Sequence, residues 1–127
     1  MVKNIKLEIF TPEKKALEQN VYRVVLPYGN TNLTIVDNRA PTSLVLHAGP
    51  LQILDENNQI EDLYFIDGGV IDGAENICKI SVRHIVHRRS ISAERATKLA
   101  TEEPQNALFY KMIADYINAF EGKDGKE

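Results

Sequence analysis

Few side chains in this sequence have the types and spacings that support catalysis. His84 and His87 stand three apart at the predicted end of a strand, and a metal site there would need a third ligand such as Asp72 or Cys78. Two histidines at that spacing on a strand end face one ion only if the chain reverses, so solvated histidines are the expected interpretation. Cys78 lies in an apolar strand pattern, which predicts a buried and inert thiol.

The other motifs that could carry chemistry also have structural explanations. Gly68-Gly69 follows a strand pattern but lacks the downstream Lys-Ser/Thr of a phosphate-binding loop, so it is predicted to be a turn. The acidic pairs Asp55-Glu56, Glu61-Asp62 and Glu102-Glu103 fall at predicted turns or helix ends, where solvation or capping explains them. The sequence therefore predicts no enzyme active site, no metal site and no cofactor.

One segment has an unusual charge. The chain carries 15 basic and 18 acidic residues, a net charge of −3, whereas residues 79–98 hold six cations against the single acid Glu94. That segment is therefore +5 and the remainder is −8. Such a segment is a solvated face, a contact for an acidic protein surface or an anion site, and the sequence alone does not choose among them. The cations are Lys79, Arg83, Arg88, Arg89, Arg95 and Lys98.

Composition limits the broad class of protein. A length of 127 residues suits one domain, or a small domain with an appendage, and 43% hydrophobic residues are enough to form a core. A pI near 5.6 argues against a general nucleic-acid binder. A single cysteine and an opening without an apolar signal segment predict a reducing compartment. No uncharged run approaches the ~20 residues that span a bilayer, so any membrane association is predicted to come through a partner.

The first part of the chain is typical of short strands. All nine valines lie at or before Val86, whereas six of the ten alanines follow it. Alternating apolar residues at Ile5, Leu7 and Ile9 predict a strand with one buried face. No helical stretch separates the strands, so we predict an N-terminal antiparallel β-sandwich, or flattened barrel. The further predicted strands are Val21–Leu26, Leu33–Val36, Ser43–His47, Leu51–Leu54, Glu61–Ile66 and Ile77–Ile85, with turns at Pro27–Asn30, Asp37–Asn38, Gly49–Pro50, Asp55–Asn58 and Asp67–Gly69.

The last part predicts a C-terminal two-helix antiparallel hairpin. Ser92 is expected to cap the first helix, on which Glu94 and Lys98 can pair, and Pro104 suits the first turn of the second. We therefore divide the chain into a sandwich domain at 1–87, a hairpin at 88–121 and a flexible tail at 122–127. The predicted apolar faces are Ala93, Ala96, Leu99 and Ala100 on the first helix, and Leu108, Phe109, Met112, Ile113, Tyr116, Ile117 and Phe120 on the second.

Four segments resemble the epsilon subunit of rotary F-type ATP synthases. Ile5–Lys14 is similar to the opening strand of that family, and Val24–Pro27 to its second-strand motif. Leu33–Pro41 resembles its Gly-Val-Leu-Pro-Gly-His-Ala-Pro segment, and Phe65–Gly69 its Val-Ser-Gly-Gly turn. Order and spacing agree, and the resemblance covers nearly the whole chain, including the sandwich and the hairpin.

The resemblance implies a non-catalytic central-stalk (rotor) subunit of a proton-translocating ATP synthase, which couples the catalytic ring to the membrane c-ring through gamma. The implied partners are gamma, the c-ring and, through a weakly inhibitory hairpin, the alpha and beta subunits, without nucleic acid and without direct membrane insertion. The implied location is peripheral, at the inner (plasma) membrane and on the cytoplasmic side in a bacterium; a mitochondrial or chloroplast counterpart stays open. The alternatives are a non-catalytic interaction module of the same fold outside the synthase, and a small ligand-binding or hydrolytic domain using His84 and His87.

Departures from the family pattern bear on the expected sites. Asp37-Asn38-Arg39 stands where the family usually has Pro-Gly-His, so the rotor-facing loops have diverged. Ile91–Ala96 resembles the Ile/Leu-Asp-x-x-Arg-Ala motif with which some bacterial members bind ATP, but Ser92 replaces the aspartate and only Lys111 stands where such members place arginines. A nucleotide site at Ile91, Arg95 and Ala96 is therefore expected to be weak or absent. The expected partner-binding residues are Arg39, Asp67, Gly68, Gly69, Arg88, Arg89, Arg95 and Lys98.

Overall fold

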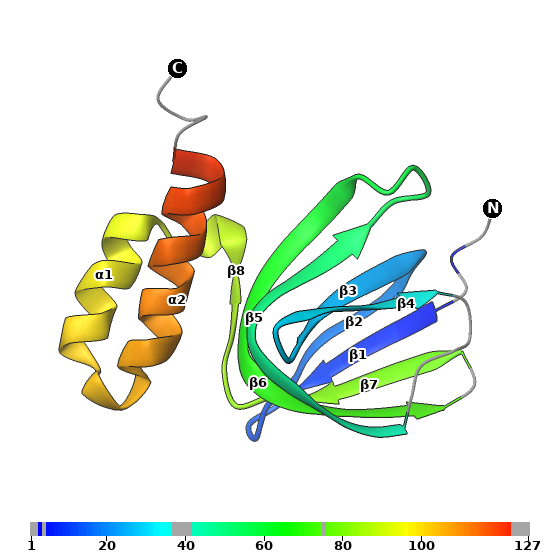
Figure 1. Ribbon diagram of the computed structural model, residues 1–127. Helices are drawn as coiled ribbons and strands as arrows, with labels where there is room; N and C mark the ends of the chain where they lie inside the picture. The colour runs from blue at the N-terminus through cyan, green and yellow to red at the C-terminus, as the bar shows by residue number, and fades with distance from the viewer. Residues whose placement is uncertain (1–2, 4, 37–41, 75, 123–127) are drawn as a thin grey trace. The chain divides into compact units, whose positions relative to one another are not determined.

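The chain forms two compact units, Met1–Ile85 and Val86–Glu127. The computed structural model describes residues 3, 5–36, 42–74 and 76–122 (Figure 1). Strands make up the first unit and helices dominate the second, which confirms the predicted fold class of a β-sandwich followed by two helices. In the described residues no helix is both long and apolar enough to cross a membrane.

The described strands form one eight-stranded sheet that does not close into a barrel, and all but the last two residues of β8 belong to the first unit. The strand order is β2-β1-β7-β6-β5-β3-β4, and β8 pairs with β6 outside this order. The pairs along this order are antiparallel except β1 with β7, which is parallel and is a local exception to the predicted pattern. The strands are β1 (Ile5–Phe10), β2 (Lys15–Val21), β3 (Arg23–Tyr28), β4 (Thr31–Val36), β5 (Thr42–Leu54), β6 (Ile60–Ala74), β7 (Ile77–Ser81) and β8 (Ile85–His87).

Two predicted turns are wrong, because both lie inside long strands. Gly49-Pro50 is part of β5, where Pro50 pairs in register with Phe65 of β6. A Cβ at Gly49 would stand 2.7 Å from the Cβ of Pro27, so the glycine allows close packing of β3 on β5. Asp67–Gly69 is likewise part of β6. Figure 1 shows the resulting long strands β5 and β6 curving through the sheet.

Other strand limits also differ from the prediction. The edge strand β2 was not predicted, since Lys15, Glu18 and Asn20 interrupt its apolar pattern. Four ion pairs support it there: Lys6 and Lys15 each lie within 3.6 Å of both Glu8 and Glu18. Val21–Leu26 divides between β2 and β3 at Tyr22, and Ile77–Ile85 divides between β7 and β8.

The predicted turn at Asp55–Asn58 is confirmed, and the one at Pro27–Asn30 is confirmed in part. The side chain of Asp55 accepts hydrogen bonds from the backbone N–H groups of Asn57 and Gln59, and Asn58 has a positive φ of 63°. Gly29, with φ of 61°, begins the turn that joins β3 to β4, whereas Pro27 and Tyr28 are the last residues of β3. The predicted turn at Asp37–Asn38 lies outside the described residues.

The core of the first unit comes from alternate residues of seven strands and the segment after β7. Ile5, Leu7 and Ile9 of β1 are at most 1% exposed, as their alternation predicts. The rest of this cluster consists of Val21, Val24, Leu26, Ile35, Leu46, Leu51, Ile53, Ile66, Ile71, Cys78, Ile80 and Val82.

The second unit contains the two predicted helices, α1 (Ala93–Glu102) and α2 (Ala107–Ile117). Ser92 caps α1 as predicted, because its Oγ accepts a hydrogen bond from the Arg95 N–H at 3.0 Å. Lys98 lies 3.9 Å from Glu102, one turn further on, and not beside Glu94 as predicted. Short helical turns complete the unit: η1 (Arg88–Ser90), η2 (Pro104–Asn106), which leads into α2, and η3 (Asn118–Gly122).

The apolar faces of the hairpin are only partly as predicted. Ala96 and Ala100 of α1 are buried, and so are Phe109, Ile113 and Ile117 of α2. Leu108 and Phe120, which the spacing assigned to the same apolar face, are 83% and 67% exposed. Helical spacing placed them near the buried stripe, but their side chains point to solvent.

Candidate functional site

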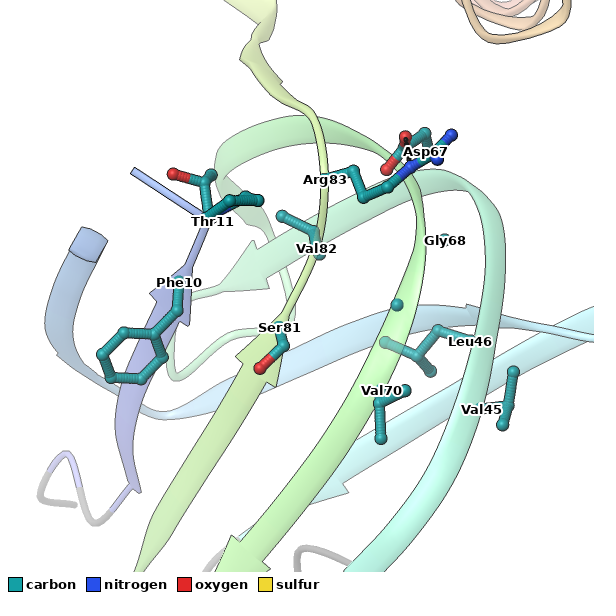
Figure 2. A pocket seen from close by; sticks show the side chains of 12 residues that line it. Phe10, Thr11, Val45, Leu46, Asp67, Gly68, Val70, Ser81, Val82 and Arg83 are labelled. Atoms are coloured by element: carbon teal, nitrogen blue, oxygen red, sulfur yellow. Dashed lines mark ion pairs between the residues drawn. The ribbon is translucent and has the colours of Figure 1, made fainter. Parts of the chain in front are cut away.

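A groove of about 670 Å³ opens on the first unit where β1, β5, β6 and β7 come together (Figure 2). Its residues come from parts of the sequence that are more than 70 positions apart, so the sheet topology alone assembles it. The groove is lined by Phe10, Thr11, Pro12, Val45, Leu46, Asp67, Gly68, Gly69, Val70, Ser81, Val82 and Arg83.

Val45 and Val70 form a solvent-exposed apolar wall of the groove. Val45 and Val70 pair across β5 and β6 in register, and they are 62% and 44% exposed. Figure 2 shows both side chains at one side of the groove, with Leu46 near them. Neighbouring β-branched residues on adjacent strands form a continuous apolar surface, of the kind that commonly marks a contact site.

The glycine pair shapes the floor of this groove. A Cβ at Gly69 would collide with the carbonyl oxygen of Ser81 and would stand 2.9 Å from Cγ1 of Val82. Gly68 has a φ of 110°, which side-chain-bearing residues rarely adopt. Gly69 therefore allows β6 to lie tightly against the end of β7, whereas a Cβ at Gly68 would face the backbone of β5, 3.3 Å from the Leu46 carbonyl oxygen.

Asp67 fastens the segment that follows β7. Its carboxylate accepts a hydrogen bond from the His84 N–H at 3.1 Å and lies 3.2 Å from His84 Nδ1 and 3.6 Å from Arg83 Nε. The carboxylate is only 10% exposed, whereas the Arg83 side chain is 80% exposed. Asp67 thus holds Val82–His84 against β6, and Arg83 presents a positive charge at the rim of the groove.

The predicted basic residues of the second unit differ in how exposed their side chains are. Arg88 is half-buried and donates a hydrogen bond from Nη1 to the carbonyl oxygen of Ile91 at 2.8 Å, which fixes the entry to α1. The side chains of Arg89, Arg95 and Lys98 are exposed. Three of the four predicted cations of this unit are therefore accessible at its surface, and Arg39 lies outside the described residues.

The degenerate nucleotide motif is built mainly as a helix start. Ile91 and Ala96 are 6% and 0% exposed, so their side chains face the interior of the protein. The Ser92 hydroxyl is engaged in capping α1, and Lys111 is an exposed residue of α2. Of the three expected nucleotide-site residues Ile91, Arg95 and Ala96, only Arg95 is exposed.

The residues first considered for chemistry have structural roles. Cys78 is fully buried, and this burial raises the pKa of its thiol to about 12, which makes it the inert residue that was predicted. His84 faces Asp67, and His87 accepts a hydrogen bond from the Arg89 N–H at Nδ1. Among the described residues, no three His, Cys, Asp or Glu side chains are grouped as metal ligands.

Comparison with known proteins identifies the family. Residues 4–88 match the model of the ATP synthase Delta/Epsilon chain, beta-sandwich domain, which is about two thirds of the chain. The chain belongs to the ATP synthase delta/epsilon family. As a member it is an epsilon-type subunit of ATP synthase and is not itself catalytic. The resemblance seen in the sequence is thereby confirmed.

Individual relatives and solved structures agree with this assignment. The ATP synthase epsilon chain of Granulibacter bethesdensis is 30% identical over 114 residues, covering 89% of this chain and 84% of the relative. The sodium-ion-specific epsilon chain of Propionigenium modestum is 27% identical, covering 75% and 68%. The fold resembles a chain in the Euglena gracilis mitochondrial ATP synthase, with a TM-score of 0.66, 16% identity and coverage of 99% and 82%. It also resembles a chain in the central stalk and c-ring of the Tetrahymena thermophila mitochondrial ATP synthase. The TM-score is 0.58 and the identity 19%, and the match covers 87% of this chain and 96% of the other.

The sequence did not single out the apolar wall of the groove. Val45 was predicted only as part of a strand, and Val70 followed a predicted turn. The missing signal is the β5–β6 register, which sets the two valines opposite each other. Asp67, Gly68 and Gly69, by contrast, were predicted from the family motif and do line the groove.

Proposed function

We propose that this delta/epsilon-family chain is a rotor subunit that joins the gamma subunit to the c-ring and so couples the membrane sector to the catalytic ring. In this proposal the sandwich binds gamma through the groove, the sheet edges and the loop that carries Arg39. The observation that supports it most is the exposed pair Val45 and Val70 beside a floor of glycines. Removing such apolar surface from water is favourable by about 25 cal/mol per Å², before the costs of association are subtracted.

The charged rim of the groove gives the proposed contact its orientation. Arg83 is exposed at one end, while Asp67 is engaged with His84 and Arg83 and is largely buried. We therefore assign Arg83 to a direct contact with an acidic group of gamma. Asp67, Gly68 and Gly69 shape the surface that gamma meets.

Capture of gamma tests this proposal. The full chain carrying Val45→Asp and Val70→Asp is compared with the wild type, and Ile60→Asp is the matched control because Ile60 is also exposed, at 54%, on β6 but does not line the groove. A charge in a desolvated apolar contact costs several kcal/mol, so gamma affinity should fall at least about thirtyfold in the double variant and stay unchanged in the control. Equal binding by all three folded proteins would refute the groove as the gamma site.

The hairpin is proposed to act as a weak brake on ATP hydrolysis. Arg89, Arg95 and Lys98 are exposed cations that can face an acidic surface of the alpha and beta subunits, while Arg88 supports the start of α1. Reversing the charge at Arg95 and Lys98 should raise the hydrolysis rate of the assembled enzyme about twofold and remove its dependence on salt. Lys111→Glu, on α2, is the control. Identical hydrolysis with wild-type, charge-reversed and hairpin-deleted chains would show that the hairpin is no brake.

ATP is expected to bind weakly or not at all. Ser92 supplies no carboxylate, and the Ile91 and Ala96 side chains are buried. Loss of one hydrogen-bond partner costs about 1–3 kcal/mol, or roughly 5- to 150-fold in affinity, and loss of a charged partner costs more. Calorimetric titration of the full chain with ATP at physiological salt should therefore detect no tight binding, and tight, magnesium-independent binding would contradict this expectation.

A further inference from the structure

The turn between β3 and β4 is held to β5 by a histidine. The backbone N–H of Gly29 donates a hydrogen bond to Nδ1 of His47, with a nitrogen-to-nitrogen distance of 2.9 Å. Gly29 itself has a φ of 61° and belongs to the exposed turn of Gly29 and Asn30. Imidazole nitrogen accepts a hydrogen bond only where it carries no proton, so this bond requires a neutral ring that is protonated at Nε2.

His47 connects this turn with the rim of the groove. It stands two residues beyond Val45 on β5, so the two side chains lie on the same face of the strand. The register pairs Leu46 with Gly69 and Ala48 with Asp67, which places His47 opposite Gly68. Gly68 has no side chain to support the imidazole from β6. The Gly29 bond is the one hydrogen bond or ion pair of the His47 side chain within the described residues.

Among the described residues, no acidic or basic side chain forms an ion pair or hydrogen bond with the His47 ring. On β6 the group at this level is Asp67, whose carboxylate is engaged with His84 and Arg83. On β3 it is the phenol of Tyr28, next to the turn, and β4 carries no charged residue. The His47 side chain is exposed, so water delivers the proton directly.

We propose that His47 is a positioning residue that holds the Gly29–Asn30 turn beside the groove while its ring is neutral and releases the turn when the ring is protonated. Protonation places an N–H at Nδ1, which then faces the Gly29 N–H donor, and two donors cannot bond. Histidine is the side chain whose charge ordinarily changes between about pH 5 and pH 8, so a change of pH within that range tests this bond. Insofar as the groove binds gamma, which rests on the proposed function, that binding should weaken in acid.

The release of the turn is tested first without any partner. Nuclear magnetic resonance of the full chain, between about pH 7.5 and about pH 5.5, follows the His47 ring and the Gly29 amide together. We expect amide exchange at Gly29, corrected for the intrinsic effect of pH, to become about fivefold faster as His47 titrates, since the lost bond contributes about 1 kcal/mol. His47→Gln, whose side-chain oxygen can still accept, should show no such step. A Gly29 amide that does not respond to His47 titration would overturn the proposal.

The effect on partner binding is tested second. Capture of the cognate gamma subunit by the wild-type chain should fall about fivefold between the two pH values, and His47→Gln should abolish the change. His87→Gln is the control histidine variant, because His87 accepts the Arg89 N–H and does not line the groove. An unchanged wild-type affinity would contradict the link between turn and groove. Absence of gamma binding at both pH values would refute the proposed function instead, while the amide measurement still decides the role of His47.

Discussion

The sandwich and the hairpin keep their shapes by different means. Large branched side chains from seven strands fill the interior of the first unit. In the second unit, α1 contributes the small residues Ala96 and Ala100 to the buried surface. Among the described residues, the large side chains that are less than 2% exposed all belong to the first unit, with the single exception of Ile113. The buried side chains of the sandwich are therefore mostly larger and more completely enclosed than those of the hairpin.

This difference predicts that the hairpin opens more easily than the sandwich. Elements with few large buried contacts open at lower free energy than the core of a domain. The groove and its glycine floor lie on the well-packed unit, whereas the exposed cations Arg89, Arg95 and Lys98 lie on the other. Such a division fits a permanent rotor contact for the sandwich and a changeable regulatory contact for the hairpin.

The largest expected effect comes from removing a core side chain of each unit. Ile71→Ala in β6 should lower the free energy of unfolding by about 2–5 kcal/mol, because its side chain is fully buried among several strands. Ile113→Ala should leave a cavity of similar size, but its effect should be confined to the hairpin. Denaturant titration measures the first effect, and hydrogen exchange locates the second.

Leu108→Ala is the matched control for this pair, since Leu108 is 83% exposed and its truncation should change stability by less than about 0.5 kcal/mol. If Ile113→Ala also weakens the protection of amides in the sheet, the two units share one cooperative core and the comparison between them fails.

An intermediate effect is expected at the floor of the groove. Gly69→Ala forces the new methyl group onto the Ser81 carbonyl and within 2.9 Å of Val82, and relief of such overpacking typically costs about 1–3 kcal/mol. Gly29→Ala is the control, because a Cβ there meets nothing within 4 Å and only the positive φ, about 1 kcal/mol, opposes it. Thermal unfolding compares the two. A negligible cost at Gly69 would show that the neighbouring strand moves to admit the methyl group and that crowding does not require the glycine.

The elements that local patterns control could be predicted from the sequence. The alternation of Ile5, Leu7 and Ile9 and the cap at Ser92 each depend on neighbouring residues, and both were found as predicted. Gly49-Pro50 and Gly68-Gly69 were misread because their composition is typical of turns. Contacts with Pro27 and with the end of β7 decide their conformation, and both contacts join segments that are distant in the sequence.

The candidate site shows the same limit. The family motif pointed to Asp67–Gly69, since a motif is a local signal. The apolar wall at Val45 and Val70 and the bond between Gly29 and His47 depend on strand register, which composition and periodicity do not specify. The chain could therefore be assigned a place in the synthase from its residues, while the contact surface required the arrangement of the strands.

The smallest expected effect concerns the edge strand β2, the part of the sandwich with the weakest apolar pattern. Hydrogen bonding by Lys15, and then by Lys6, lowers the pKa of Glu18, and the same pairing raises the pKa of both lysines. Because the folded pKa of Glu18 is lowered, its contribution is present above the unfolded value, about 4.3, and is lost as the pH falls through the folded pKa. The lysine contributions persist until the pH rises through their own raised pKa values.

All three side chains are solvent-exposed, so salt should screen the effect. Glu18→Gln should therefore cause a small loss of stability near neutral pH that disappears at low pH and at high salt, measured by denaturant titration. Gln19→Glu, a change beside the cluster, is the matched control. A Glu18→Gln effect that is independent of both pH and salt would mean that packing holds β2 in place, as it does the rest of the sandwich.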